Sequence, residues 1–209
     1  ADLWGPIRLK GVDATVYIYA LQRSLAWMAR ELGKPADEAA LWDAMADETR
    51  AAVRRRMWDP DREFFVDVHA RRIWNPEAQA WDENEPPETG DRCPSMAAVG
   101  YYPFLTDIAG PEHLAAMRLY LFSPRHFGTP WPVPSQSLDD PLSDPEGRWK
   151  GKRTRCPWNG RAWLMTTSHV ADALGNAALT LDRDLRPQAA DFLHRYIRML
   201  FIDRDPQRP

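Results

Sequence analysis

The chain has 209 residues, which is long enough for one substantial hydrophobic core or two small ones without a disulfide framework or metal staple. Its 27 basic and 30 acidic side chains give a net charge of −3, which removes the electrostatic case for a nucleic-acid or anionic-membrane partner. Ten tryptophans and 19 prolines, in a chain that is 44% hydrophobic, disfavour both disorder and a coiled coil.

The first part of the chain predicts a pair of helices. Residues 12–32 are apolar on nearly every side, with Asp13 as the expected N-cap and Gly33 as the stop, which favours a buried helix. Residues 36–57 place apolar side chains four apart and end in arginines, the pattern of an amphipathic outer helix. A buried helix, a short break and an amphipathic helix predict an αα-hairpin.

A strand-rich stretch follows. From Trp58 to Trp74 the chain alternates apolar and polar residues around Asp59-Pro60-Asp61, which predicts a small β-hairpin. The acidic residues of this stretch lack the central glycine and the final glutamate of a calcium loop, so no calcium site is expected. Residues 75–95 are rich in Pro, Glu, Asp and Asn and predict a surface loop.

The pairing of helices then recurs twice. Ser95 begins a nearly all-apolar helix that runs to Ile108, and after Gly110-Pro111 a second helix follows over residues 114–122. Residues 160–178 predict a third inner helix, and residues 185–200 a third outer, amphipathic one. Alternating buried and amphipathic helices suggest an inner and an outer ring. The predicted fold is therefore all-α, one partial domain over 1–209 that forms about half of a helical toroid.

Two long, proline-rich segments carry the candidate chemistry. Trp158 and Trp163 straddle the start of the third inner helix, with the amide of Asn159 between them. Indoles can stack on the C–H faces of a sugar ring while an amide binds its hydroxyls, so this junction suits a carbohydrate subsite. The alternative is a tryptophan pair that caps the core, with Asn159 as N-cap. The loop from Phe127 to Ser135 presents Trp131 and Ser135 on a backbone stiffened by prolines.

Other chemistries have weaker support. Asp139 and Asp140 are adjacent and point in different directions, so they are a poor acid/base pair and a solvated turn is the simpler interpretation. The five histidines show no zinc-binding spacing, and no nucleotide-binding or serine-nucleophile motif is present, so no metal and no cofactor is expected. His169 either faces a central cavity or is an ordinary core histidine.

Three ordered segments resemble a known family. Residues 11–19, the loop from His126 through Ser135 to Asp139-Asp140-Pro141, and the segment from Trp158 to Trp163 are similar to motifs of the (α/α)6-barrel glycosidases. These are the enzymes of glycoside hydrolase family 63, mannosylglycerate hydrolase and the related trehalases. The resemblance implies hydrolysis of α-glucosides or α-mannosides with inversion, by an acid and a base about 6.5–9.5 Å apart.

The resemblance also assigns residues to the substrate. Aromatic subsite positions of the family match Tyr17, Trp158 and Trp163; Asn159 lies in the same segment, and Trp131 and Ser135 are carried over as further substrate-binding candidates. The family's segments for the catalytic acid and base have no match, so we expect a fragment that lacks both carboxylates. Arg161-Ala162 and Leu164 depart from the family pattern, which has proline at these places.

Alternatives from other classes remain at this point. One is a non-catalytic carbohydrate-binding or scaffold toroid, and another is an epimerase or lyase on the same barrel, with His169 or Tyr101 as base. The expected partners are a carbohydrate substrate and, because half a toroid exposes apolar inner faces, a second copy or a complementing half. With no membrane span or signal segment, the cytoplasm is the default location. Cys93 and Cys156, each just before an inner helix, are expected to pair.

Overall fold

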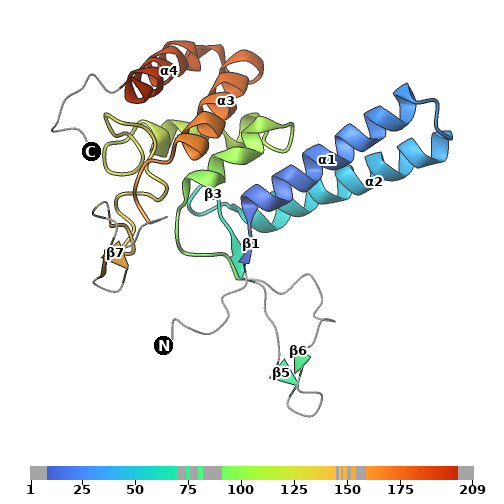
Figure 1. Ribbon diagram of the computed structural model, residues 1–209, viewed down its shortest axis with the longest axis horizontal. Coiled ribbons are helices and arrows are strands. Elements are labelled where there is room, and N and C mark those ends of the chain that lie inside the picture. Colours follow the sequence, from blue (N-terminus) through green and yellow to red (C-terminus); the bar gives the residue numbers. More distant parts are fainter. Residues whose placement is uncertain are drawn as a thin grey trace. The chain divides into compact units, whose positions relative to one another are not determined.

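The computed structural model describes residues 9–69, 74–75, 80–81, 91–144, 146, 148–149, 152–153 and 159–201 (Figure 1). The chain divides into two compact units. The first comprises Ala1–Asp59 and Val66–Pro94, and the second Pro60–Phe65 and Ser95–Pro209. Within the described ranges, no helix is long and apolar enough to cross a membrane.

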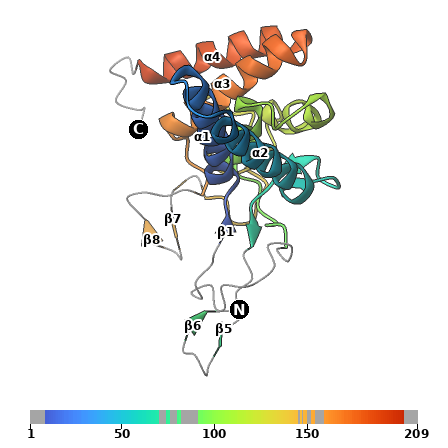
Figure 2. The ribbon, with the colours of Figure 1, turned by 90° about the vertical axis from the view of Figure 1, so that its right-hand side faces the viewer.

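The first unit is built on a helical hairpin. Helices α1 (Val12–Glu31) and α2 (Ala36–Ala52) lie side by side in both views (Figures 1 and 2), and α2 continues as a π-helical turn, η1 (Val53–Met57). Gly33, at φ 62°, ends α1, because its left-handed conformation lets the next amide donate back to the carbonyl of Ala29 at 2.9 Å. The predicted first αα-hairpin is confirmed.

Two details of α1 differ from the expectation. Its N-cap is Gly11, not Asp13, and the carboxylate of Asp67 accepts the first helical N–H, that of Val12, at 2.8 Å. The helix is also not buried all round: one stripe is covered, whereas Leu21 on another face is 57% exposed. A helix that packs against one partner helix buries only the stripe that faces this partner, and its other apolar side chains stay exposed to solvent.

Short strands flank this hairpin in the sequence. Strand β1 (Leu9–Lys10) pairs antiparallel with β4 (Val68–His69), and β5 (Trp74–Asn75) pairs with β6 (Ala80–Trp81). The predicted β-hairpin is present, because β2 (Trp58–Asp59) and β3 (Phe64–Phe65) lie on either side of a turn at residues 60–63. The predicted loop over residues 75–95 falls mostly outside the described residues.

The second unit carries the other helices. They are η2 (Ala98–Leu105), η3 (Pro111–His113), η4 (Met117–Leu121), α3 (Leu164–Thr180), η5 (Arg183–Leu185) and α4 (Arg186–Leu200), with a two-stranded ribbon of β7 (Arg148–Trp149) and β8 (Lys152–Arg153). Helices α3 and α4 form the third predicted hairpin (Figures 1 and 2).

The second predicted pair takes a different helical form. The expected α-helix from Ser95 to Ile108 is the eight-residue 3₁₀-helix η2, with Pro103 inside it. Proline lacks the N–H of an α-helical hydrogen bond and its ring crowds the carbonyl four residues earlier, which explains the tighter, shorter helix. The expected helix over residues 114–122 is present but short: residues 115–116 are α-helical and continue as the π-helical turn η4, which ends at Leu121.

The core of the second unit is aromatic. Phe64 is fully buried, with its ring 5.2 Å from that of Tyr101 and 5.9 Å from that of Phe127. Gly100 allows this close packing, because a Cβ there would lie 2.3 Å from Cε1 of Phe64. Helix α3 packs on η2 beside this cluster and buries Val170 and Leu174. The core thus supports both η2 and α3, and the candidate site lies just before α3.

Candidate functional site

Two loop segments meet just before α3. The N–H of Ser135 donates to the carbonyl of Arg161 at 2.9 Å, and Oγ of Ser135 accepts the N–H of Gly160 at 3.0 Å. Beside them, Pro134 and Ala162 form an antiparallel bridge. Gly160 lies at φ 134°, a conformation that favours glycine, so the close approach of the two segments depends on a glycine at this position. The proline-rich loop and the tryptophan segment are therefore joined through backbone and Ser135.

The proline-rich loop is also attached to the helices behind it. The buried hydroxyl of Thr167, on α3, donates to the carbonyl of Pro132 and accepts the N–H of Val133, each at 3.0 Å. The N–H of Ala98, at the start of η2, donates to the carbonyl of Ser135 at 2.9 Å. Because these buried polar groups are satisfied, the loop is held at several points by α3 and η2.

The two adjacent carboxylates have structural partners. Oδ2 of Asp140 accepts the hydroxyl of Ser95 at 2.6 Å, and that hydroxyl accepts the amide of Gln136 at 2.6 Å. Oδ1 of Asp139 accepts the hydroxyl of Ser137 at 2.6 Å and lies 3.0 Å from Nδ1 of His126. Both carboxylates therefore hold the loop together.

Asp139 is kept ionised by its neighbours. Partial burial acts to raise the pKa of its carboxyl group, but the hydrogen bonds from Ser137 and His126, with the nearby charges of His126 and Arg125, outweigh burial. The net result is a pKa below the ordinary value of 3.8. A carboxyl group with a lowered pKa suits a structural hydrogen-bond acceptor better than a proton donor.

The predicted site residues fall into three groups. Trp131, Asn159, Ser135 and Trp163 all lie in the joined segments: Trp131 is 41% exposed, Asn159 is largely buried with Nδ2 3.3 Å from the carbonyl of Leu142, and Trp163 is the N-cap residue of α3. Tyr17 lies on α1 in the first unit, and its side chain is 44% exposed. Trp158 lies outside the described residues, as does Cys156, so the expected pairing of Cys93 with Cys156 stays a prediction.

The structure argues against both candidate bases of the alternative epimerase or lyase reaction. Tyr101 is fully buried, and desolvation raises the pKa of its phenol well above 10.0. A phenol that stays protonated and enclosed cannot take a proton from a substrate. The ring of His169 stacks on Tyr102 at 5.0 Å, and its Nδ1 lies 2.8 Å from the carbonyl of Met165. That contact makes Nδ1 the donor, so His169 is tied to the start of α3.

Sequence reasoning missed the residues that hold the site. Thr167 stands in a run of hydroxyl residues on the third inner helix, and that run was the available signal. Ser95 and Gln136 offered no such signal, because their roles depend on contacts across the loop.

Across the described ranges, no three His, Cys, Asp or Glu side chains gather as a metal ion would require. The arrangement offers aromatic rings and an amide on a fixed backbone, which suits binding of a polyhydroxyl ligand.

Comparisons with known proteins agree with this interpretation of the fold. Residues 2–205 match the family model of the mannosylglycerate hydrolase MGH1-like glycoside hydrolase domain. A solved structure of the family 63 mannosylglycerate hydrolase from Thermus thermophilus, in complex with Tris, is similar with a TM-score of 0.64 at 15% identity. That likeness covers 94% of this chain and 39% of the other.

Two further structures show the same fold. A protein named a sialidase is similar with a TM-score of 0.76 at 15% identity, over 95% of this chain and 16% of the other. The neutral trehalase of Saccharomyces cerevisiae is similar with a TM-score of 0.58 at 16% identity, over 80% of this chain and 28% of the other. The predicted all-α toroid fold is confirmed, and the chain spans well under half the length of each of these proteins.

A short match to a curated protein adds no function. An uncharacterized protein of Borreliella burgdorferi is 39% identical over 49 residues, which is 23% of this chain and 10% of the other.

Proposed function

Because the chain belongs to the mannosylglycerate hydrolase MGH1-like glycoside hydrolase family, we propose that it is part of an inverting glycoside hydrolase that acts on α-glucosides or α-mannosides. The observation that carries the proposal is the family match over residues 2–205. Inversion requires a carboxylic acid at the leaving oxygen and a carboxylate that activates water, about 6.5–9.5 Å apart. The names of the similar mannosylglycerate hydrolase and trehalase support the choice of sugar.

Within this protein we assign sugar binding to the joined segments before α3. Trp131 and Trp163 would stack on the C–H faces of a pyranose ring, with Trp158 as a third indole in the same segment. The amide of Asn159 would accept and donate to hydroxyls. Ser135, whose hydroxyl accepts the N–H of Gly160, would keep the two segments together as well as reach the sugar. Tyr17, on α1, is a further proposed aromatic contact.

The rigidity of the loop supports this assignment. Trp163 precedes the first residue of α3, and its carbonyl accepts the N–H of Thr167 at 2.8 Å. The hydroxyl of Thr129 donates to the carbonyl of Trp131 at 2.7 Å. Because both tryptophans sit on a backbone that is already ordered, binding a sugar would cost little additional conformational entropy.

Tryptophan fluorescence tests the binding part of the proposal. Titration with glucose, mannose and maltose should change the emission, and Trp163→Ala should remove most of that change. Trp42→Ala is the matched control, because this indole lies on α2 and belongs to none of the proposed contacts. An emission spectrum that none of the sugars alters, or an identical response in Trp163→Ala, would contradict the assignment.

Product analysis tests the reaction, and it uses the longer protein of which we propose this chain is a part, because the chain itself is expected to lack both catalytic carboxylates. Proton magnetic resonance of an α-glycoside during hydrolysis should show the β-anomer of the released sugar first, because inversion reverses the configuration at the anomeric carbon. If the α-anomer appears first, the inverting mechanism is wrong. If sugars bind and no hydrolysis occurs, the non-catalytic carbohydrate-binding protein is the better description.

We also infer that the apolar side chains exposed on α1 associate with a second copy or a complementing part of a toroid. Four of them line much of the helix: Ile18, Leu21, Trp27 and Met28. Exposed apolar groups of this kind mark interaction surfaces. Sedimentation of the protein at increasing concentration should show association, and Leu21→Glu should weaken it. A monomer at every concentration would argue against the second copy.

A further inference from the structure

A groove in the second unit lies apart from the segments before α3. It has a volume of about 520 Å³, opens to solvent, and is lined by residues from the loop after η4 and from α4: Phe122, Gly128, Pro187, Gln188, Asp191 and Arg195. None of these residues belongs to the sugar contacts proposed above. Its volume falls within the range of small-molecule sites in proteins.

The polar wall of the groove is held in place by Arg195. Its Nη1 donates to the carbonyl of Thr129 at 2.7 Å, and its Nε donates to Oδ2 of Asp191 at 2.9 Å. The guanidinium also lies over the ring of Phe192, 5.9 Å from the ring centre. Two of its N–H groups are therefore used within the protein, and the others remain to donate to a ligand.

The charge of the groove favours a neutral ligand. Asp191 and Arg195 form an ion pair, so their charges largely cancel within the groove. An anion would meet the carboxylate of Asp191, and a cation would meet the guanidinium of Arg195. A divalent metal ion would find one carboxylate where it prefers several oxygen ligands.

The remaining groups match hydroxyls and C–H faces. The amide of Gln188 offers one acceptor and two donors. The free oxygen of Asp191 accepts, the unused N–H groups of Arg195 donate, and the side chains of Phe122 and Pro187 add apolar surface. A saccharide combines hydroxyls that donate and accept with apolar ring faces. From this combination we propose that the groove binds a neutral mono- or disaccharide, as a site separate from the subsite before α3.

The test follows backbone amide resonances of the full chain during titration with maltose. The expected result is that maltose shifts the amides of residues 122, 128 and 188–195. Gln188→Ala should weaken this binding by about tenfold, which corresponds to loss of one good hydrogen bond. Asp191→Ala should weaken it by a similar factor. Arg195 is left intact, because its removal would also release Thr129.

Controls separate this site from the proposed function. His194→Ala is the matched control, since His194 is an exposed residue of the same helix and does not line the groove. Trp163→Ala should remove most of the fluorescence response and leave the groove shifts unchanged, so each site can fail alone. None of the described residues that line the groove is a tryptophan, so its occupancy is read from the amide shifts.

Three outcomes would overturn the proposal. One is that maltose at tens of millimolar leaves the groove amides unshifted. A second is that glucuronate or inorganic phosphate shifts them more strongly than maltose, which would identify an anion site. Equal affinity for maltose in Gln188→Ala, Asp191→Ala and the parent protein would likewise place the sugar elsewhere.

Discussion

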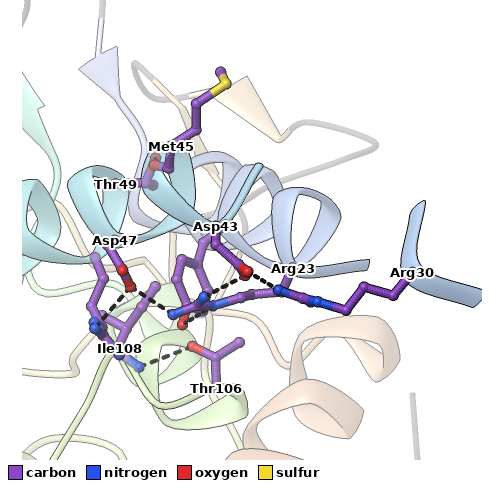
Figure 3. Close-up of polar contacts among 10 residues, drawn as sticks. Arg23, Arg30, Asp43, Met45, Asp47, Thr49, Thr106 and Ile108 are labelled. Carbon is purple, nitrogen blue, oxygen red and sulfur yellow. Dashed lines mark hydrogen bonds and ion pairs between the residues drawn. The ribbon is translucent and has the colours of Figure 1, made fainter. Parts of the chain in front are cut away.

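The helical hairpin of the first unit and the core of the second unit are stabilised in different ways. Between α1 and α2, Arg23 bridges Asp43 at 2.9 Å and Asp47 at 2.7 Å, and Arg30 is also paired to Asp43 (Figure 3). Within α2, Arg50 pairs with Asp47. The buried side chains of these helices include several small ones: Ala26, Ala29, Ala39 and Ala46. The second unit instead buries large aromatic rings around Phe64.

This difference indicates which interactions stabilise each region. Alanines let two helices approach closely but bury little apolar area, and the partly exposed ion network adds a small contribution that depends on salt and pH. The aromatic core buries much more area per residue and depends little on salt or pH. The core therefore supplies a fixed base for the candidate site, while the hairpin keeps apolar residues available on α1.

The largest expected effect is on the aromatic core. Phe64→Ala should lower the free energy of unfolding by about 3–5 kcal/mol, because it removes a fully buried ring and leaves a cavity beside Tyr101 and Phe127. Leu21→Ala, on the exposed face of α1, should change it by less than about 0.5 kcal/mol. Urea unfolding followed by circular dichroism measures both. Similar losses of unfolding free energy in the two variants would contradict the proposed difference between the two regions.

A smaller effect is expected from overfilling the same core. Gly100→Ala should cost about 1–3 kcal/mol, since the added Cβ would meet the ring of Phe64 and the carbonyl of Phe65, 2.4 Å away. Gly175→Ala is the matched control: apart from its chain neighbours and the adjacent backbone of α3, no described atom lies within 4 Å of its Cβ position. In a helix that exchange should stabilise by about 0.5–1 kcal/mol. Thermal unfolding gives the sign of each change, and a neutral Gly100→Ala would show that the core is looser than these distances indicate.

The smallest effect concerns the ion network of the hairpin. The hydrogen bond from Arg30, followed by that from Arg23, holds the pKa of Asp43 below 3.8. A lowered pKa means that the ionised form stabilises the folded state above pH 3.8, and that this contribution disappears as the pH falls through the folded-state pKa. Asp43→Asn should therefore be less stable than the parent protein at pH 7, and the difference should vanish in strong acid.

Salt provides the second arm of that experiment. Because the pairs are partly exposed, 1 M NaCl should shrink the difference between Asp43→Asn and the parent protein at pH 7. Asp172→Asn, at an exposed position of α3, should show no comparable dependence on pH or salt. A difference that persists unchanged in high salt and in acid would mean that Asp43 acts through packing rather than charge.

Sequence patterns predicted the fold better than they predicted its details. Apolar spacing and the stop at Gly33 found the α1–α2 hairpin, and the same reasoning found α3 and α4. The apolar run over residues 95–108 predicts an α-helix, whereas the structure has a 3₁₀-helix there with Pro103 inside it. Asp13 was expected to cap α1, whereas Asp67, 55 residues away, accepts its first N–H.

The candidate site shows the same division. Trp131, Asn159 and Trp163 could be selected by residue type, since indoles and amides suit sugars wherever they occur together. A linear pattern does not show that Ser135 joins their two segments. Nor does it show that Thr167, 35 positions further along the chain, fixes the loop at Pro132.

The sequence alone determined the helical hairpins and the family resemblance, because periodicity, stop residues and motifs are local and survive without knowledge of neighbours. Only the tertiary structure decided which carboxylate caps α1, which hydroxyl holds the proline-rich loop and where a groove opens beside α4. Those features depend on groups brought together from distant positions. Their hydrogen bonds and charges acquire their strength from that proximity and from burial, neither of which residue order reveals.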